Sequence, residues 1–371
     1  MKISHISVYT CKQRLKIPFR HASSGLIEFL DGVYVKVETD AGFEGFGEVR
    51  GNCSYFTGDT TDAVVSVIAN EIAPKLIGKD PEDIAELNRL VDSSIVRNMA
   101  AKSACNCALY DLLGKIRGVP VYRLLGEKIH TTLNSEENIP FMPVQEAEAM
   151  AQHVIDNGCR FIKMRVGAKD FQYDLDRVSA VWQIIGRNAL QNEIVFSMDA
   201  NRGWETDQAI RCINALSQFG ITIVEQPIHF SSINQMRKLK ENCPVKIFGD
   251  EDVGTIEELQ RYAELGLIDG IHIKLIKCGG IANAMQLVRI CKEFGISYMI
   301  GGMDEGMMAV AAAVQCAAVC DTNFFEVHGH MRIQEDPTTG LEVIGSIVTV
   351  PASPGLGVTI DETKLKKSFE I

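Results

Sequence analysis

Three acidic residues, Asp199, Glu225 and Asp250, end three consecutive short runs of strand-forming residues. The carboxyl ends of neighbouring parallel strands meet at one edge of a sheet, so these three side chains are expected to lie side by side. Carboxylates that are crowded together and buried repel one another unless a cation neutralises them. Oxygen ligands favour a hard cation, so the sequence predicts Mg²⁺ here, with Mn²⁺ as the second candidate. The competing interpretation is that each acid only caps the helix that follows it.

Three basic residues flank this acidic set. Lys163 and Arg165 are two positions apart in one strand-like run, so they are expected to share one face of that strand. Lys274 ends the strand-like run that follows Asp250. A lysine near a divalent cation and other positive charges has a lowered pKa, and it can remove the α-proton of a carboxylate substrate while the metal stabilises the enolate. The alternative is that the three basic residues are only structural counter-charges.

All six residues fall within a repeating order of elements that begins near residue 128. Strand-like runs, each followed by a helix-like segment, occupy 160–166, 194–199, 221–225, 245–250, 270–274, 296–300 and 324–327, and 131–133 is the expected first strand. This alternation is typical of βα units around a parallel sheet, and seven or eight such units suit a closed barrel. Residues 128–350 are therefore expected to form an α/β barrel with the charged residues at its mouth.

The chain before and after the barrel has a different pattern. Residues 1–127 combine strand-like segments with later helical patterns, which is typical of a small α+β unit. Segments 15–26 and 50–60 fit neither pattern and are expected to be loops. Residues 351–371 are expected to form a tail that returns to the N-terminal unit.

Composition limits the classes of function. The chain has 371 residues, a formal net charge of −11 and a pI near 5.3, which argues against a nucleic-acid partner. Its apolar runs are shorter than a membrane span, and the N-terminus lacks the pattern of a signal peptide. Its eleven cysteines lack the spacing of a zinc site and fit a reducing compartment. We therefore expect a soluble, cytoplasmic protein without a membrane partner.

The ordered motifs resemble those of the enolase superfamily, in its mandelate racemase/muconate lactonizing enzyme group and more closely its muconate lactonizing branch. The matching text is Phe-Ile-Lys163-Met-Arg165-Val-Gly, Met-Asp199-Ala-Asn, Val-Glu225-Gln-Pro, Gly-Asp250-Glu and Ile-Lys274-Leu-Ile-Lys-Cys-Gly-Gly. The likeness spans essentially the whole chain. It implies a modified TIM barrel, (β/α)7β, behind an N-terminal α+β capping domain, and assembly into a homo-oligomer.

The resemblance also implies roles for the charged residues. It implies that Mg²⁺ is bound by Asp199, Glu225 and Asp250, and that Lys274 is the acid/base group on one face of the substrate. The segments 15–26 and 50–60 would close over a small-molecule carboxylate substrate and exclude water.

One position departs from the family pattern. The branch usually carries Lys-x-Lys where this chain has Lys163-Met-Arg165, and a guanidinium is a poor base. The sequence therefore favours chemistry with one base, in which Lys274 serves the syn dehydration or the cycloisomerisation of an amino-acid-derived or hydroxy acid. The alternative is a racemase or epimerase of an amino-acid derivative (an N-acyl amino acid, a dipeptide or a proline-type compound) with acid/base groups on both faces. A Schiff-base aldolase and a non-catalytic metal-binding protein are distant alternatives.

Other residues are weaker candidates for a place in the site. Those predicted to bind substrate are Glu305 and Asp304 for a positive nitrogen, Tyr55 and Phe56 as covering aromatic residues, and Arg20 and His21 for a second acidic group. Those predicted to have structural roles are His272 inside the barrel, Lys277 as a surface charge, and His328 and His330 in a solvated loop.

Overall fold

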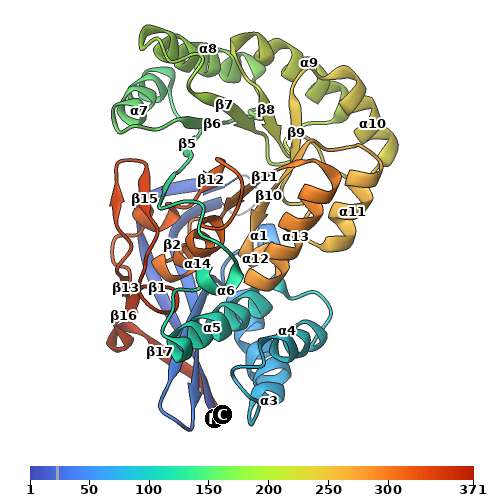
Figure 1. Cartoon of the computed structure of the whole chain (residues 1–371). Coiled ribbons are helices and arrows are strands. Elements are labelled where there is room, and N and C mark those ends of the chain that lie inside the picture. Colours follow the sequence, from blue (N-terminus) through green and yellow to red (C-terminus); the bar gives the residue numbers. More distant parts are fainter. Residues whose placement is uncertain (22–24) are drawn as a thin grey trace.

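The computed structural model describes the chain except for residues 22–24, and the side chains of residues 19–25 also lie outside the described part. The N-terminal part is an antiparallel sheet with the strand order β17-β1-β2-β3, drawn in blue and red in Figure 1. Its strands are β1 (Ile3–His21), β2 (Gly25–Thr39), β3 (Glu44–Arg50) and β17 (Lys366–Glu370). Because β17 pairs with β1, the end of the chain completes the sheet that its beginning starts. The division at residues 1–127, 128–350 and 351–371 stays a prediction.

The expectation of a loop at 15–26 is wrong. In the described residues of this segment, up to His21 and from Gly25, strands β1 and β2 continue and pair with each other, and Phe19 is opposite Ile27 after an irregularity that follows Arg14. Pro18 and the pair Ser23-Ser24 interrupt the alternation of apolar and polar residues in the sequence. Leu15 and Ile27 are nevertheless buried, as residues of a strand with one buried face are. The backbones of Arg20 and His21 lie in β1, whereas their side chains fall outside the described residues.

Helices cover one face of this cap sheet. Helices α2 (Thr61–Val67) and α5 (Met99–Arg117) pack on the sheet itself. The other helical elements of this part of the chain are a π-helical turn (Ile68–Ile72), α3 (Ala73–Leu76), α4 (Ile84–Ser93) and α6 (Tyr122–Leu125), of which α6 packs against α14 (Met307–Ala317) of the barrel. Helix α5 lies so close to β3 that a Cβ atom on Gly47 would be 2.1 Å from the Ala104 carbonyl oxygen. The glycines of β3 therefore allow close packing of the helix on the sheet. Segment 50–60 is irregular, as expected, except for the single turn α1 (Ser54–Thr57).

Eight parallel strands form the barrel, in the order β12-β11-β10-β9-β8-β7-β6-β5. They are β5 (Glu137–Ile139), β6 (Phe161–Arg165), β7 (Val195–Asp199), β8 (Ile223–Glu225), β9 (Lys246–Gly249), β10 (Gly270–Lys274), β11 (Ser297–Gly301) and β12 (Phe325–Glu326). A parallel bridge between Ser135 and Phe325 joins the two edges, so the predicted barrel class is confirmed.

The prediction that residues 131–133 form the first barrel strand is wrong. Strand β4 (Thr132–Asn134) instead pairs with β15 (Ile347–Thr349), which also pairs with β14 (Val343–Ile344). The barrel begins at β5, whose sequence is acidic and polar at its start. A strand that begins with Glu137 and Asn138 gives no hydrophobic pattern, whereas β4 carries no charged residue and fits a strand pattern better.

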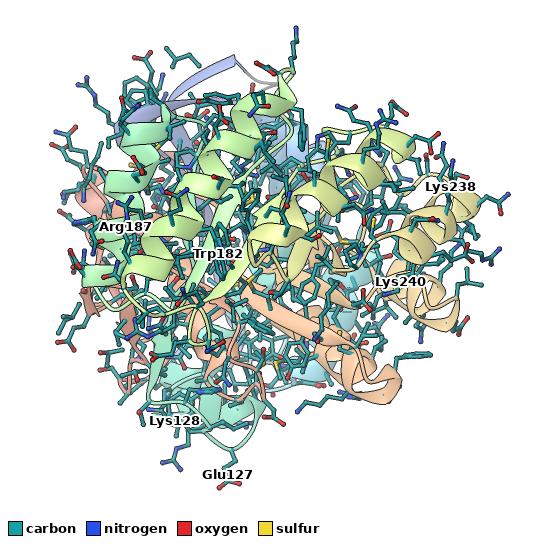
Figure 2. All side chains as sticks on the ribbon, turned by 90° about the horizontal axis from the view of Figure 1, so that it is seen from above. Glu127, Lys128, Trp182, Arg187, Lys238 and Lys240 are labelled. Atoms are coloured by element: carbon teal, nitrogen blue, oxygen red, sulfur yellow. The ribbon has the colours of Figure 1, made fainter. Side chains whose placement is uncertain are left out.

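An outer layer of helices surrounds the barrel, and Figure 2 shows it from above. Its helices are α7 (Val144–Asp156), α8 (Phe171–Arg187), α9 (Thr206–Leu216), α10 (Ile233–Asn242), α11 (Ile256–Glu264), α12 (Leu275–Cys278), α13 (Ile281–Phe294) and α14 (Met307–Ala317). The ring of Trp182 on α8 stacks on Phe196 of β7 with centroids 6.1 Å apart, whereas Lys238 on α10 points outward. Among the described helices, none combines the length and the apolar character needed to cross a bilayer.

Candidate active site

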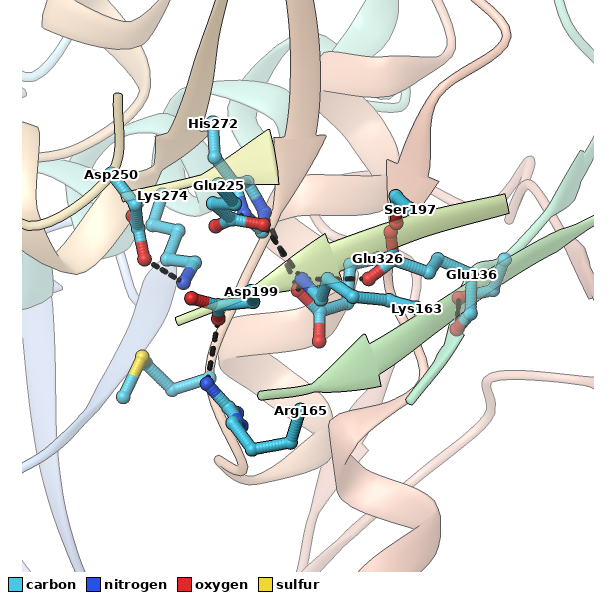
Figure 3. A network of polar contacts seen from close by, with 12 residues as sticks. Glu136, Lys163, Arg165, Ser197, Asp199, Glu225, Asp250, His272, Lys274 and Glu326 are labelled. Carbon is cyan, nitrogen blue, oxygen red and sulfur yellow. Dashed lines mark hydrogen bonds and ion pairs between the residues drawn. The ribbon is translucent and has the colours of Figure 1, made fainter. Parts of the chain in front are cut away.

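The three predicted acidic residues lie together at the carboxyl ends of adjacent strands. Asp199 ends β7, Glu225 ends β8 opposite it, and Asp250 directly follows β9. All three are buried, with exposed fractions of 2%, 2% and 0%. Buried carboxylates at this spacing need positive charge close by, and Figure 3 shows that basic side chains surround them.

Lys274 and Lys277 hold Asp250 between them. Lys274 Nζ donates to Asp250 Oδ2 at 2.6 Å, and Lys277 Nζ donates to Asp250 Oδ1 at 2.8 Å. Burial alone would raise the pKa of Asp250, but the two ammonium groups lower it below its usual value. The prediction that Lys277 is a surface charge is wrong, because the turn α12 folds its side chain back under the strand end, where it is only 7% exposed.

Arg165 is bound to Asp199. Its Nη1 donates to Asp199 Oδ2 at 2.6 Å. Burial lowers the pKa of Arg165, but the Asp199 charge outweighs burial and raises the pKa further above the value of a free guanidinium. Arg165 therefore stays protonated at every physiological pH, and it lies on the face of β6 that the sequence predicts.

A buried ion pair behind β6 fixes the position of Arg165. Arg177 Nη1 donates to the Arg165 carbonyl at 2.9 Å, and Asp174 Oδ2 accepts from the backbone N–H groups of Gly167 and Ala168 at 2.8 and 2.9 Å. Both Asp174 and Arg177 are 0% exposed. These bonds hold the end of β6 and the loop that follows it.

Lys163 occupies an acidic environment deeper in the barrel. Its Nζ lies 2.7 Å from Glu136 Oε1, 2.9 Å from Glu225 Oε2 and 3.2 Å from Glu326 Oε2. Burial lowers the pKa of Lys163, but the three glutamates raise it well above its usual value. Sequence reasoning missed both Glu136 and Glu326. Glu326 ends β12 as Glu225 ends β8, so its place at a strand end was the available signal.

His272 and two of the acids form a group that could hold a cation. As alternation along β10 predicts, His272 points into the barrel, and its Nδ1 lies 2.8 Å from Glu225 Oε1. One ligand atom from each of Glu225, Asp250 and His272 lies within 4.8 Å of the others. The third predicted ligand, Asp199, is outside this group, and its two oxygens accept from Arg165 and from the Asn201 backbone N–H. Two carboxylates beside a neutral imidazole suit a divalent metal ion.

Residues of the cap and the seventh barrel loop lie next to Lys274. The Phe56 ring centroid is 5.0 Å from Lys274 Nζ. Glu305 is 5% exposed, and burial raises its pKa to about 7. Asp304 Oδ1 lies 3.1 Å from the guanidinium of Arg332. The structure thus brings Phe56 to the lysine and leaves Asp304 already paired.

The expectation that His328 and His330 lie in a solvated loop is wrong, because both side chains are buried. His328 lies 2.6 Å from Ser135 Oγ and 3.0 Å from Glu137 Oε2. Burial lowers the pKa of His330 to about 4, so this imidazole is neutral near pH 7. His328, which directly precedes the short 3-10 helix Gly329–Arg332, thus contacts the start of the barrel.

A glutamate of the cap sheet connects the cap to α14 beside this site. Glu48 of β3 accepts from the Tyr34 hydroxyl at 2.7 Å and from the backbone N–H of Ala309 at 3.2 Å. Burial, with a smaller contribution from Asp336, raises the pKa of Glu48 from 4.5 to about 8. The N-terminus of α14 favours a negative charge on Glu48, but burial opposes the ionisation of this carboxyl group.

Glu48→Gln is expected to flatten the dependence of stability on pH. Between pH 4.5 and about 8 the folded protein holds a proton on Glu48 that the unfolded chain has lost, so wild-type stability falls as pH rises through this window. The variant, which resembles the protonated acid, should lack this fall of roughly 1–4 kcal/mol. Urea unfolding at several pH values measures it. Parallel curves for the two proteins would show that Glu48 ionises normally.

Comparisons with known proteins agree with this architecture. The family described as "Mandelate racemase / muconate lactonizing enzyme, N-terminal domain" matches residues 5–126, and "Enolase C-terminal domain-like" matches residues 145–364. L-Ala-D/L-Glu epimerase of Clostridium acetobutylicum is 32% identical over 363 residues, 96% of this chain and 97% of that protein. Chloromuconate cycloisomerase of Pseudomonas putida is 28% identical over 316 residues, 84% of each chain.

Solved structures give the same result. The dipeptide epimerase of Cytophaga hutchinsonii, complexed with Mg and the dipeptide D-Ala-L-Val, matches with a TM-score of 0.90 and 27% identity over 100% of both chains. Most of the curated relatives are epimerases of dipeptides or racemases of amino-acid derivatives, and cycloisomerases are a minority. The chain is therefore an isomerase or lyase that belongs to the mandelate racemase/muconate lactonizing enzyme family of the enolase superfamily.

Proposed function

We propose that the protein is a Mg²⁺-dependent racemase or epimerase of an amino-acid derivative such as a dipeptide or an N-acyl amino acid. The observation that carries the proposal is the placement of Lys274 and Arg165 on β10 and β6, which lie four strands apart in the barrel order, with the acidic residues between them. The names of most relatives support this reading over the lyase reading that the sequence favoured. A substrate held above the acids would thus have a basic residue on each side.

The metal would be held by Glu225 and Asp250, with Asp199 and His272 as adjoining donors. When bound, Mg²⁺ would attract the substrate carboxylate and lower the cost of the negative charge that develops there. The donor set of this structure fits that ion, because the carboxylate oxygens of Glu225 and Asp250 lie within 4.8 Å of each other. Lys277 stays on the far side of Asp250 and keeps that side chain in place.

Lys274 removes the α-proton on one face of the substrate. It is 6% exposed beneath Phe56, so the covering aromatic ring excludes water from the lysine during proton transfer. Burial lowers the pKa of Lys274, and Asp250 and Glu225 raise it more strongly, to above its usual value. The lysine can take up a proton only after it has lost its own, so neutralisation of Asp250 and Glu225 is required for its action as a base.

Arg165 is the group that can reach the second face. Its side chain is 29% exposed, whereas that of Lys163 is 2% exposed and bound by three glutamates. Delivery of a proton by Arg165 to the second face would leave a neutral guanidine, which solvent must reprotonate, and inversion in the reverse direction would need that neutral form as the base. Because Asp199 holds Arg165 in its protonated form, either step at Arg165 is expected to be slower than proton exchange at Lys274. We therefore expect Lys274 to exchange the α-proton of one stereoisomer faster than the enzyme inverts it.

The protonated state of Arg165 also supports a second candidate function. If it only binds the substrate carboxylate, Lys274 alone serves the reaction, which would be a syn dehydration or a cycloisomerisation as the sequence suggests. Wild-type protein would then exchange the proton or form product without inverting the α-carbon.

Arg165→Met separates these two functions. For an epimerase, the variant should retain Mg²⁺-dependent exchange of the α-proton with D₂O but lose inversion by roughly 10²- to 10⁴-fold, and Arg165→Lys should restore inversion. Proton NMR measures the exchange, and chiral chromatography measures inversion. Inversion by Arg165→Met at the wild-type rate would show that another group serves the second face.

A further inference from the structure

Arg177 on α8 continues the connection between two neighbouring barrel strands where their own pairing ends. Strand β5 pairs with β6 as far as Ile139 opposite Met164, and the next positions along the two strands are Pro140 and Arg165. Arg177 Nη1 donates to the Arg165 carbonyl at 2.9 Å, and Nη2 donates to the Pro140 carbonyl at 2.5 Å. The guanidinium fork therefore holds the backbone of Arg165 to the loop that follows β5.

The guanidinium of Arg177 is itself held by two aromatic rings. Its Cζ lies 5.3 Å from the Phe141 ring centroid and 5.2 Å from the Tyr173 ring centroid. The Tyr173 hydroxyl donates to the Met142 carbonyl at 2.6 Å, so this ring is fixed to the loop that follows β5. Arg177 is 0% exposed, and its side chain has lost the rotational freedom of a surface arginine. The carbonyl of Arg165 thus has a rigid partner.

Asp174, one turn earlier on α8, holds the loop that follows β6. Its Oδ1 lies 3.4 Å from Arg177 Nη1, and its Oδ2 accepts from the backbone N–H of Gly167 at 2.8 Å. Gly167 has a φ of +101°, and a Cβ atom there would be 3.3 Å from the Ala200 carbonyl oxygen. The loop that follows β6 therefore packs closely on the residue next to Asp199.

The stability of the fold alone gives little reason for an ion pair at this position. Asp174 and Arg177 are both 0% exposed, and Arg177 Nε has no hydrogen-bond partner within the described residues. Removal of two charges from water is costly, and apolar residues of the same volume often stabilise a core equally well. A planar fork that reaches two carbonyls, however, fixes backbone geometry in a way that apolar side chains do not.

Arg165 is the side chain that these contacts position. It ends β6, is 29% exposed, and donates through Nη1 to Asp199 at 2.6 Å. Proton transfer to carbon requires a short, aligned path, so a displacement of about 1 Å can lower the rate roughly 10²-fold. Lys274 lies four strands away on β10, so a shift at the end of β6 should affect proton transfer on one face only.

We propose that Arg177 is a positioning residue for the second face of the reaction, because it sets the reach of Arg165 toward the substrate α-carbon. It acts through the Arg165 carbonyl and, together with Asp174, through the loop that follows β6. The contacts of Arg177 then determine how fast the enzyme inverts the α-carbon relative to exchange of its proton. The inference rests on the proposed function, since it requires Arg165 to serve the face opposite Lys274.

The test measures two rates on one substrate. The substrate is the dipeptide or N-acyl amino acid whose α-proton wild-type protein exchanges fastest in D₂O with Mg²⁺. Proton NMR measures exchange, and chiral chromatography measures inversion. Arg177→Lys keeps the charge but loses the fork, and it should lower inversion roughly 10- to 100-fold while exchange stays within about threefold of the wild type. Both rates are proportional to the concentration of folded enzyme, so their ratio is independent of a loss of stability.

Two further variants complete the test. Asp174→Asn, which weakens the hold on the loop that follows β6, should lower the same ratio by a smaller factor. Arg187→Lys changes an exposed arginine in the last turn of the same helix, labelled in Figure 2, and it should leave both rates unchanged.

Two results overturn the proposal and leave the proposed function standing: an unchanged ratio in Arg177→Lys, or equal losses of exchange and inversion. Inversion by Arg165→Met at the wild-type rate, or no exchange by wild-type protein with any substrate, contradicts the proposed function and this inference with it.

Discussion

Lys274→Met is expected to abolish exchange of the substrate α-proton, with a loss of roughly 10²- to 10⁴-fold or more in kcat. The reason is that Lys274 is the basic group on its side of the barrel beneath Phe56, and methionine has no proton acceptor. Asp250 keeps Lys277 as its partner, so the strand end should stay in place. Deuterium incorporation from D₂O, followed by mass spectrometry, measures the loss.

Two controls make this result specific. Lys238→Met changes an exposed lysine that is paired with Asp207 on the outside of the barrel, and it should leave exchange unchanged. Circular dichroism and the melting temperature show whether Lys274→Met is folded. A folded Lys274→Met protein that keeps exchange within about tenfold of the wild type would place the base on another residue.

Glu225→Gln is expected to have the second large effect, because it should weaken Mg²⁺ binding and exchange together. Glu225 accepts from Lys163 at 2.9 Å and lies 2.8 Å from His272 Nδ1, so it connects the candidate metal position to the buried ion network. Replacement by a neutral amide removes one negative charge from this network and would replace an anionic ligand of the metal by a weaker, neutral one. We expect a loss of roughly 10²- to 10⁴-fold in exchange.

Calorimetric titration with Mg²⁺ and treatment with EDTA test the same point. The wild-type protein should lose exchange in EDTA and regain it with Mg²⁺. Glu225→Gln should have a much higher Kd for Mg²⁺, and added Mg²⁺ should not restore its exchange to the wild-type rate. Asp207→Asn, which changes an exposed acid, is the matched control. Full exchange by the wild-type protein after removal of metal would contradict the role of the acids and would favour a Schiff base on Lys274, which borohydride trapping detects.

The residues that the sequence placed at the site share one feature, a position at the end of a strand-like run. Asp199, Glu225 and Lys274 end β7, β8 and β10 in the structure, because hydrophobic strands are easy to delimit and parallel strands expose their ends at one edge. His272 followed from alternation with Lys274. Local rules of this kind require no knowledge of packing.

The missed residues depend on contacts that no local pattern contains. Lys277 reaches Asp250 because α12 turns back against the strand end, and Glu136, which directly precedes β5, lies beside Lys163 of the neighbouring strand β6. The strands on either side of residues 22–24 were missed because pairing of β1 with β2 overrides the weak propensity of their residues.

The most direct test of the central claim is a screen for α-proton exchange by wild-type protein in D₂O with Mg²⁺. The substrates are dipeptides and N-acyl amino acids, with mass spectrometry and chiral chromatography as readouts. We predict incorporation of one deuterium at the α-carbon of at least one of these substrates, slower inversion of the same carbon, and loss of both effects in Lys274→Met. The account is contradicted if no substrate takes up deuterium, or if uptake is the same with EDTA and in Lys274→Met.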